Sequence, residues 1–234
     1  MEWIYGRQVT RLALAPGARR RVQRLAATAS GLAAIGRRLP TGLPVDTMSA
    51  PELDRLTSTH DHQGVAVLVD GYPYVNAREL VAADLLVVLD EVSDPRNLGA
   101  VARSALASGA HGLVLPRRRS AGVTPAAVKA SAGATEHLCI AHVSSVAAYL
   151  KELQRGGFWV YGAAGDAARS YVELDYAGKV ALVLGSEGRG LRPLVARTCD
   201  VLASIPMDGA VESLNVSVAA ALLLFEARRQ RQAS

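Results

Sequence analysis

The sequence predicts an α/β protein whose main sheet is mostly parallel, with a second, smaller α/β domain at the N-terminus. Strand-like apolar runs alternate with helical segments from residue 85 onward, as a parallel sheet requires. A shorter set of such runs precedes residue 76. With 234 residues, the chain suits one large or two modest domains, each able to bury a core.

The smaller domain is expected to span residues 1–75, followed by a linker at 76–83. Strand-like runs lie at Val22–Ala27, 43–46 and Val65–Val69, with helical stretches between them. Ser49 and Glu52 have the spacing of a capping box, which predicts that one of these helices begins just after Ser49. Residues 84–234 then form the larger domain.

The larger domain is predicted to contain the mostly parallel sheet. Its strand-like runs are at residues 85–89, 112–115, 138–142, 158–162, 180–184 and 201–205. In open α/β sheets, ligands bind beyond the carboxyl ends of the strands. The turns after these strands are therefore the places where a functional site is expected.

The turn after the strand at 201–205 leads into the last predicted helix. Ser213 is placed to cap a helix over residues 214–229, where apolar residues recur at helical spacing. Asn215 and Ser217 are polar and weaken the first turn of this otherwise apolar helix. Extra capping and a functional role explain these two residues about equally well.

A glycine-rich turn follows the strand at 180–184. Gly185, Gly188 and Gly190 either let a ligand approach the backbone closely or simply form a tight turn. Their spacing matches neither the dinucleotide-binding nor the phosphate-binding glycine motif, and Glu187 argues against a bound phosphate.

An acidic turn follows the strand at 85–89, with carboxylates at Asp90, Glu91 and Asp94. Such a cluster is compatible with a magnesium site, because Mg²⁺ prefers oxygen ligands. A solvated turn is the favoured interpretation.

The next helix is expected to start at Asn97, which can cap it. Gly99 leaves a bare patch on this helix, and Arg103, four residues on, lies on the same face above it. A ligand that approached this patch would meet the guanidinium. The alternative is an ordinary solvated arginine.

These features together resemble the SpoU family of the SPOUT superfamily, whose members are RNA ribose 2′-O-methyltransferases that use S-adenosylmethionine. Three motifs occur in the family's order, and no motif position departs from the family's pattern. They are Asn97-Leu98-Gly99 with Arg103, Leu184-Gly185-Ser186-Glu187-Gly188 with Gly190, and Ile205-Pro206-Met207 with Ser213-Leu214-Asn215-Val216-Ser217. The resemblance covers the larger domain fully.

Other segments resemble a bacterial subgroup that methylates guanosines of large-subunit rRNA. They are Ile4-Tyr5-Gly6, His62-Gln63-Gly64, Ser120-Ala121 and Lys129-Ala130-Ser131-Ala132-Gly133-Ala134. That subgroup carries an N-terminal domain similar to ribosomal protein L30e, which binds the RNA substrate. The resemblance therefore implies methylation of a guanosine in the peptidyl-transferase region of 23S rRNA. The alternatives are a tRNA ribose methyltransferase, a resistance rRNA methylase and a non-catalytic RNA-binding ribosome-assembly factor.

The resemblance also implies a site, a knot and a partner. The C-terminal segment would be threaded through a loop as a trefoil knot, S-adenosylmethionine would lie bent inside it, and two chains would form a homodimer. The positions that match the family's catalytic residues are Arg103, Asn97, Glu187, Ser213 and Asn215. The positions that match its cofactor-binding residues are Gly162, Ala163, Leu184, Gly185, Glu187, Gly188, Ile205, Met207, Ser213 and Leu214. Ser217 is interpreted as structural.

Charge along the chain favours RNA as the partner. The formal net charge is +5, but residues 1–40 hold eight arginines and the single acid Glu2. Basic clusters of this kind bind RNA phosphates, although a solvated face in an arginine-rich chain is the alternative. The candidate RNA-binding residues are Arg19, Arg20, Arg21, Arg24, Arg37, Arg38, Arg117 and Arg118.

The remaining features favour a cytoplasmic protein without a metal site. The longest apolar run, at 218–225, is too short to span a membrane, and the first residues lack the apolar core of a signal peptide. Cys139 and Cys199 have no metal-ligand spacing and are expected to be reduced, and the five histidines are scattered or lie in a turn.

Overall fold

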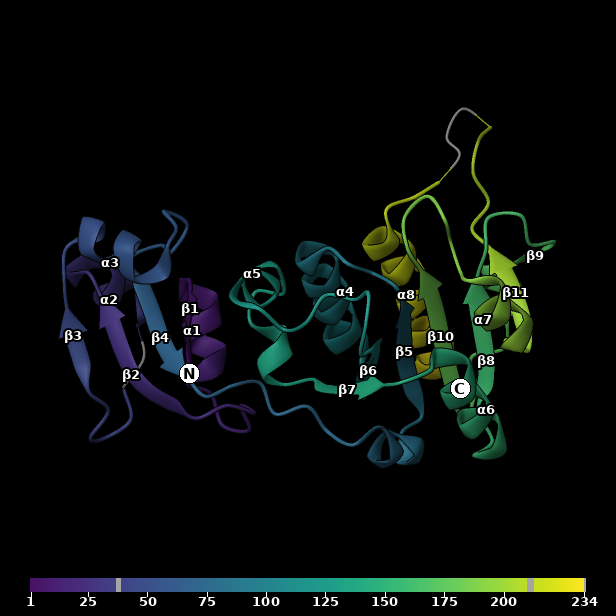
Figure 1. Cartoon of the computed structure of the whole chain (residues 1–234), viewed down its shortest axis with the longest axis horizontal. Coiled ribbons are helices and arrows are strands. Elements are labelled where there is room, and N and C mark those ends of the chain that lie inside the picture. Colours follow the sequence, from purple (N-terminus) through teal and green to yellow (C-terminus); the bar gives the residue numbers. More distant parts are fainter. Residues whose placement is uncertain (37–38, 210–212, 234) are drawn as a thin grey trace.

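The computed structural model describes residues 1–36, 39–209 and 213–233. Two α/β units, each with its own sheet, lie next to each other along the long axis of the molecule (Figure 1). The chain passes from the first unit to the second through an extended segment at residues 70–76.

The first unit has a four-stranded sheet in the order β1-β4-β2-β3. Its strands are β1 (Glu2–Tyr5), β2 (Val22–Ala27), β3 (Val45–Thr47) and β4 (Val65–Val69), and its helices are α1 (Arg7–Ala13), α2 (Ala29–Ile35) and α3 (Ala50–Thr57). The sequence predicts β2, β3 and β4, with β3 two residues early, but not β1, which pairs antiparallel with β4. The predicted start of α3 is confirmed, because the Glu52 carboxylate accepts hydrogen bonds from Ser49 N at 2.8 Å and Ser49 Oγ at 2.6 Å.

The segment His62-Gln63-Gly64 holds the turn between α3 and β4. His62 is buried, and its Nδ1 accepts a hydrogen bond from Gly64 N at 2.9 Å. Its Nε2 therefore carries the proton and donates to Asp54 Oδ1 at 2.8 Å. Gly64 has a φ of 81° and faces Thr28 Oγ1, where a side chain would not fit. These contacts give the segment a structural role within the first unit.

The second unit has a seven-stranded sheet in the order β7-β6-β5-β10-β8-β11-β9, in which every pair is parallel. In chain order the strands are β5 (Leu85–Asp90), β6 (Gly112–Pro116), β7 (Cys139–Val143), β8 (Trp159–Ala163), β9 (Arg169–Ser170), β10 (Val180–Gly185) and β11 (Val201–Ser204). All except the short edge strand β9 are predicted from the sequence. The mostly parallel α/β sheet is therefore confirmed.

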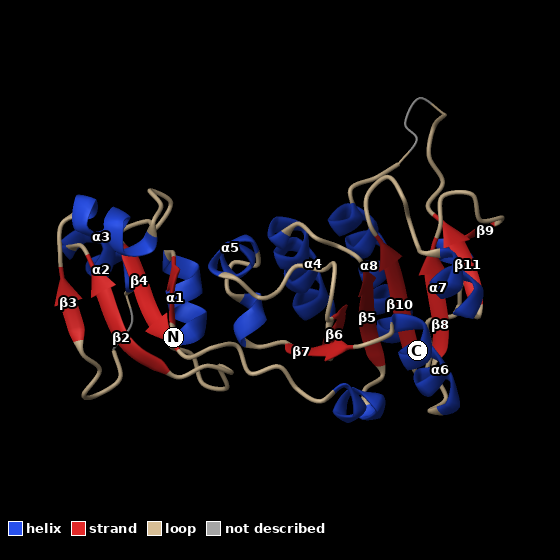
Figure 2. Ribbon diagram, viewed as in Figure 1, coloured by secondary structure: helices blue, strands red, loops and turns tan. Residues whose placement is uncertain are grey.

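Helices cover both faces of the large sheet because alternate strand residues point to opposite sides. Leu85, Val87 and Leu89 share a core with α4 (Pro95–Ser108), α5 (Pro125–Ala130) and α8 (Val216–Ala233). Leu86 and Val88 share the other core with α6 (Val146–Arg155) and α7 (Pro193–Thr198). Figure 2 shows α4 and α8 next to each other beside β5 and β10, where α8 contacts both α4 and β10.

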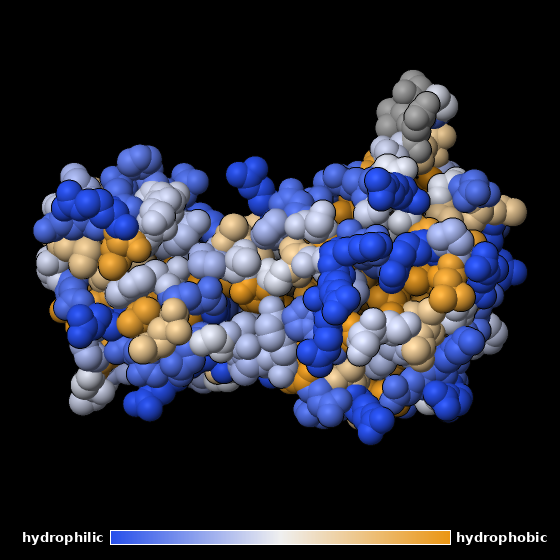
Figure 3. Space-filling model, viewed as in Figure 1, coloured by the Kyte–Doolittle hydropathy of each residue, from blue (hydrophilic) through white to orange (hydrophobic). Residues whose placement is uncertain are grey.

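Short 3-10 helices complete the second unit: η1 (Ala77–Ala82), η2 (Ala134–Glu136) and η3 (Tyr171–Glu173). None of the helices in the described ranges is long and apolar enough to cross a membrane. The face of the molecule seen in Figure 3 is largely hydrophilic.

A buried ionic cluster joins the two units. Arg20 donates to Glu136 through Nε at 2.9 Å and Nη2 at 2.6 Å, and to Glu2 through Nη1 at 2.5 Å. The side chains of Arg20 and Glu136 are both fully buried. Tyr72, in the connecting segment, donates to Leu138 O at 2.5 Å. The first unit is thereby attached to η2 and the β7 edge of the second.

Candidate functional site

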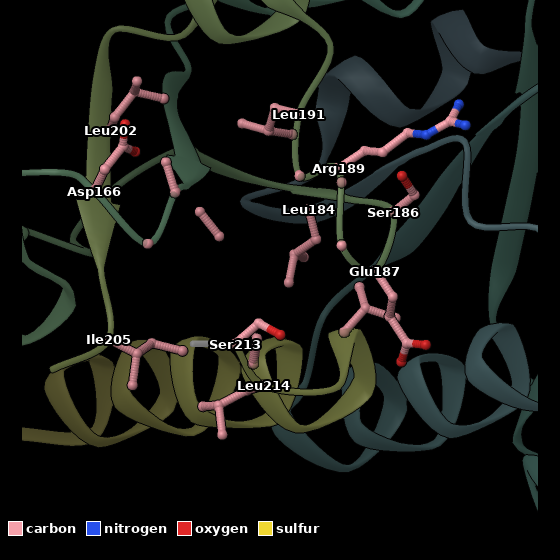
Figure 4. A pocket seen from close by; sticks show the side chains of 18 of the residues that line it. Asp166, Leu184, Ser186, Glu187, Arg189, Leu191, Leu202, Ile205, Ser213 and Leu214 are labelled. Carbon is pink, nitrogen blue, oxygen red and sulfur yellow. The ribbon is translucent and has the colours of Figure 1, made fainter. Parts of the chain in front are cut away.

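A cavity of about 490 Å³ opens beyond the carboxyl ends of β8, β10 and β11. Its walls come from the segments after these strands and from the first turns of α8. In Figure 4, Ile205 and Leu214 lie on the α8 side of the cavity, and Leu184 and Leu191 lie opposite. The site is therefore where an open parallel sheet places its ligands.

The expected cofactor-binding residues line this cavity, with one exception. Those that line it are Ala163, Leu184, Gly185, Glu187, Gly188, Ile205, Met207, Ser213 and Leu214. Gly162 is buried behind the wall, and a Cβ there would lie 2.7–2.9 Å from the side chains of Leu202, Leu191 and Cys199. Gly162 is a glycine because of this packing and does not line the cavity. Burial also raises the pKa of the Cys199 thiol to about 12, so this thiol is not a ready nucleophile.

The glycine-rich turn is both tight and part of the wall. Ser186 N donates to Gly190 O at 3.2 Å, and Gly190 N donates to Ser186 O at 2.9 Å. A Cβ on Gly185 would lie 2.1 Å from the Gly190 carbonyl group, and Gly190 itself has a φ of 63°. The two alternatives that the sequence leaves open, a tight turn and a ligand-facing backbone, are thus features of one loop.

Three of the predicted catalytic residues form a hydrogen-bonded cluster. Asn97 Nδ2 donates to Glu187 Oε1 at 3.2 Å, and Asn215 Nδ2 donates to Asn97 Oδ1 at 3.0 Å and also to Glu187 Oε1. Asn97 lies on α4, Glu187 in the loop after β10, and Asn215 just before α8. Glu187 and Asn215 are exposed and Asn97 is half-buried, so the cluster faces solvent and can meet a substrate.

The caps of the two neighbouring helices differ from those predicted. α4 begins at Pro95, and Asp94 rather than Asn97 caps it by accepting from Arg96 N at 2.8 Å. α8 begins at Val216, and Asn215 rather than Ser213 caps it by accepting from Ser217 N at 2.9 Å. In both cases several polar residues stand near the helix start, and the cap is the one whose side chain reaches a backbone N–H of the first turn.

Asn215 therefore caps α8 and also takes part in the hydrogen-bonded cluster. Its Oδ1 accepts from Ser217 N and from Ser217 Oγ at 2.5 Å, while its Nδ2 joins the cluster with Asn97 and Glu187. Ser217 is engaged in the cap, as its structural interpretation requires. Ser213 is released from capping and lines the cavity.

The expected bare patch at Gly99 is filled by the protein itself. A Cβ on Gly99 would lie 2.3 Å from Ala127 O and 2.6 Å from Ala130 Cβ, so the glycine allows α5 to pack against α4. The possibility of a ligand at this patch, which the sequence leaves open, is therefore excluded by the packing of α5. Arg103 remains exposed and forms no hydrogen bond or ion pair with any residue that the structure describes.

The acidic turn is not the solvated turn that the sequence favours. Asp90 is buried and accepts hydrogen bonds from Arg192, which raise the pKa of the Arg192 guanidinium. Glu91 lies 3.3 Å from Arg192 Nη1 and 3.4 Å from Arg119 Nη1, and Asp94 caps α4. Sequence reasoning missed Arg192 because its partner lies 102 positions away.

The candidate RNA-binding arginines divide into distinct groups. Arg20 is a correction, because its side chain is fully buried between two carboxylates and cannot reach a phosphate. Arg19 is half-buried and donates to Cys139 Sγ at 3.0 Å, and Arg24 is exposed but pairs with Asp46 at 3.2 Å. Arg21, Arg117 and Arg118 are exposed. Arg37 and Arg38 lie outside the described residues.

Several residues that line the cavity were not among those predicted, namely Ala164, Gly165, Asp166, Arg189, Gly190, Leu191, Ala196, Leu202, Ala203, Val216 and Ala219. Most of them neighbour a predicted residue in sequence, so extending each motif by a few positions would have found them. Ala196, on α7, carried no such signal. Arg189 points away from the cavity (Figure 4).

Two family models match the chain. The model of the SpoU rRNA Methylase family matches residues 84–225, and a model for RNA 2'-O ribose methyltransferase substrate binding matches residues 3–75. An uncharacterized tRNA/rRNA methyltransferase of Mycobacterium ulcerans (strain Agy99) is 44% identical over 206 residues, which are 85% of this chain and 66% of that protein. The chain thus spans just under two thirds of the length of this relative.

Solved structures match across both units. The SpoU methyltransferase AviRb from Streptomyces viridochromogenes, in complex with the cofactor AdoMet, is 27% identical with a TM-score of 0.81, over 99% of this chain and 91% of that one. The AdoMet-bound rRNA methyltransferase from Sinorhizobium meliloti is 26% identical with a TM-score of 0.78, over 97% and 87% of the two chains. With its parallel sheet, its loop cluster and a family model matched over most of its length, the chain belongs to the SpoU methylase family.

Proposed function

We propose that this protein is an S-adenosylmethionine-dependent RNA ribose 2′-O-methyltransferase that acts on a guanosine of 23S rRNA. The observation that carries the proposal is the Asn97–Glu187–Asn215 cluster, in which Glu187 also lines the cavity. Two relatives in the same family are solved with AdoMet, which supports the choice of methyl donor.

The cavity fits S-adenosylmethionine in size and charge. Its volume of about 490 Å³ lies in the range of small-molecule sites, and Leu184, Ile205 and Leu214 offer apolar walls for the adenine. The sulfonium of the donor is positive, and two acidic residues, Asp166 and Glu187, are among those that line the cavity. Arg189 points elsewhere (Figure 4), so no repulsion of the sulfonium by this cation is expected.

The bound donor supplies an electrophilic methyl group for in-line attack by a ribose hydroxyl. This chain must orient that hydroxyl and accept its proton. The two amides of Asn97 and Asn215 fix Glu187 through Oε1, while Oε2 has no partner among the described residues. We assign Glu187 Oε2 as the proton acceptor that the chain offers. Ser213, at the wall of the cavity, would contact the donor or the hydroxyl.

Arg103 is assigned to the RNA phosphate beside the target ribose. An unpaired, exposed guanidinium is suited to a bidentate contact with phosphate and to stabilising a developing alkoxide. It is poorly suited to act as a base, because arginine resists deprotonation. Its position on α4, six residues after Asn97, places it on the same element as the cluster.

Features of both units support the assignment to rRNA, the division into two domains and the knot. The match of residues 3–75 to a substrate-binding model supports a first domain that binds RNA and is similar to ribosomal protein L30e, and the match of residues 84–225 supports a catalytic domain at 84–234. The candidate phosphate contacts of the protein are the exposed residues Arg21 in the first unit and Arg117 and Arg118 in the second. A trefoil knot is supported by the insertion of β10 between β5 and β8 and by a cavity built from three separate loops.

A homodimer is supported by an apolar strip on α8. Val218, Leu222 and Phe225 occupy one helical face, and they are 47%, 36% and 48% exposed. With Tyr171 and Ala221 they line a shallow depression on the surface. Contiguous apolar surface of this kind is typical of a protein interface, and a second copy of the same helix offers a matching surface.

The decisive experiment compares ribose methylation across all rRNA and tRNA of a deletion strain and its parent. We expect loss of one 2′-O-methylguanosine in 23S rRNA, restored by the wild-type gene and not by a Glu187→Ala variant. Loss of a tRNA methylation instead would reassign the substrate. If all ribose methylations persist and calorimetry detects no S-adenosylmethionine binding, the protein is a non-catalytic RNA-binding factor and the proposal fails.

A further inference from the structure

An ion pair with a buried carboxylate lies at the end of β5, behind the loop that carries Glu187. The Asp90 side chain is fully buried, and the Arg192 side chain is 43% exposed. Asp90 Oδ1 accepts from Arg192 Nε at 2.8 Å and from Nη2 at 2.5 Å, while Oδ2 accepts from the backbone Arg192 N at 3.0 Å. Both oxygens of the carboxylate are thus committed to one residue.

This pair attaches both ends of the cavity loop to the same point. The loop at 185–191 begins at Gly185, whose neighbour across the sheet is Asp90, and it ends just before Arg192. Between these ends the backbone is held by hydrogen bonds between Ser186 and Gly190. The whole loop lines the cavity, so the Asp90–Arg192 pair closes the base of the segment that a bound donor must contact.

Glu91, next to Asp90, has a strained backbone that its contact with Arg192 helps to maintain. Glu91 has a φ of 61° and Arg119 a φ of 58°, in the left-handed region that non-glycine residues avoid. Glu91 Oε1 lies 3.3 Å from Arg192 Nη1 and 3.4 Å from Arg119 Nη1. A non-glycine residue in this region is strained and persists where surrounding contacts determine it.

We infer that Asp90 and Arg192 are positioning residues, which hold the 185–191 loop in the conformation that binds the methyl donor. The inference rests on the proposed donor site, but it concerns residues outside the cavity wall. Without the pair, the loop would spend part of its time in open conformations. The apparent affinity for the donor would then equal the affinity of the closed form multiplied by the fraction of molecules in which the loop is closed. Glu187, carried by the same loop, would also lose its fixed position beside Asn97.

The experiment measures donor affinity and loop opening separately. S-adenosylhomocysteine, which has no methyl to transfer, is titrated by calorimetry into the wild type, Arg192→Met, Arg192→Lys and Asp90→Asn. Amide hydrogen exchange of residues 186–191 is measured on the same proteins without any ligand. We expect Kd to rise at least tenfold and exchange to accelerate in Arg192→Met and Asp90→Asn. Arg192→Lys, which keeps the charge but not the bidentate contact, is expected to be intermediate.

Glu136→Gln is the matched control, since it removes a charge from a buried arginine–carboxylate pair at the junction between the units. It should lower Tm but leave both Kd and the exchange of 186–191 within twofold of the wild type. If Asp90→Asn does not fold, the two Arg192 variants decide, because that side chain is partly exposed.

Unchanged Kd and unchanged exchange in Arg192→Met would overturn the inference. Failure of the wild type to bind S-adenosylhomocysteine would instead contradict the proposed function, while the exchange of the ligand-free proteins would still test the attachment of the loop.

Discussion

The amide oxygen of Asn215 caps α8, while its amide nitrogen bonds Asn97 and Glu187. A substitution can remove the second contact and keep the first. A serine at this position would still cap α8 but could not reach both Asn97 and Glu187. For Asn215→Ser we therefore expect a Tm close to that of the wild type and a fall in kcat of at least tenfold, measured by transfer of a labelled methyl group. Asn215→Ala should show the same kinetic loss and in addition lose about 1 kcal/mol of stability with the cap.

Equal stability of the two Asn215 variants would show that the cap contributes nothing, and full activity of Asn215→Ser would remove the residue from the catalytic cluster.

The second prediction concerns Arg103. It distinguishes a guanidinium that acts through its positive charge from one that accepts the proton. If the guanidinium binds phosphate and stabilises the alkoxide, Arg103→Lys should retain measurable single-turnover methyl transfer, and Arg103→Ala should lose most of it. Because Arg103 has no partner among the described residues, neither change should shift Tm by more than about a degree or two, the range of surface substitutions. A near-normal rate for Arg103→Ala would exclude both roles.

At this scale the sequence predicted the polar residues of the site but not their partners. Asn97, Glu187 and Asn215 were identified because their positions match the motifs of the family that the sequence resembles. The Asp90–Arg192 pair could not be predicted, since nothing local relates positions 102 residues apart. Arg20 was assigned to the surface because a run of three arginines does not reveal which one points inward.

Gly99 gives a prediction at the scale of elements, because it sets the distance between α4 and α5. Alanine would raise helix propensity by about 1 kcal/mol. Its Cβ, however, would lie 2.3 Å from the backbone Ala127 O, which cannot move without shifting α5. We expect Gly99→Ala to be destabilised by about 1–3 kcal/mol in urea unfolding, the usual cost of overpacking.

Gly71→Ala is the control for Gly99, since nothing lies within 4 Å of a Cβ there, and it should change stability by less than about 0.5 kcal/mol. A Gly99→Ala protein as stable as the wild type would show that α5 is free to move away.

The elements themselves were largely predictable, and the exceptions have physical causes. Buried parallel strands are continuous apolar runs, so β5, β6 and β10 are visible in the sequence. β9 has only two residues, and β1 is a four-residue strand at the terminus with mixed polarity, so neither gives a pattern. Helix starts were displaced because several polar residues near each start can cap, and backbone geometry selects among them.

The ionic cluster connects the two units of the molecule, and it predicts which of two substitutions is the more destabilising. Arg20→Met leaves the carboxylates of Glu136 and Glu2 facing each other without a cation, whereas Glu136→Gln leaves Arg20 paired with Glu2. Removing one partner of a buried pair typically costs about 3–5 kcal/mol. We expect Arg20→Met to be the more destabilised in urea unfolding. The reverse order would mean that Glu2, 28% exposed, is satisfied by water.

The arrangement of strands in the large sheet belongs to this scale and could not be read from local patterns. β10 lies between β5 and β8, and β8 lies between β10 and β11, so neighbours in the sheet are distant in the chain. Alternation of strands and helices predicts a parallel sheet, but it is equally compatible with other orders. The family resemblance, rather than periodicity, supplied the expectation that the loops at Glu187 and Leu214 meet.

The proposed homodimer gives the last prediction. One face of α8 packs inward through Ala220, Leu223 and Leu224, so the exposed Leu222 and Phe225 on the other side are not needed for the core. Phe225→Asp should therefore leave the core of each chain intact but place a desolvated charge in the interface, which disfavours association. We expect light scattering after size exclusion to give twice the chain mass for the wild type and the single-chain mass for Phe225→Asp.

Leu194→Asp is the matched control for the dimer, because Leu194 is 58% exposed on α7, which packs on the other face of the sheet. This variant should remain a dimer. A monomeric wild type at tens of micromolar would contradict the proposal. A dimeric Phe225→Asp would place the interface on another surface. Because the α8 strip follows directly from the segment at 213–215, a monomeric variant that also lost donor affinity would show that association orders the cavity wall.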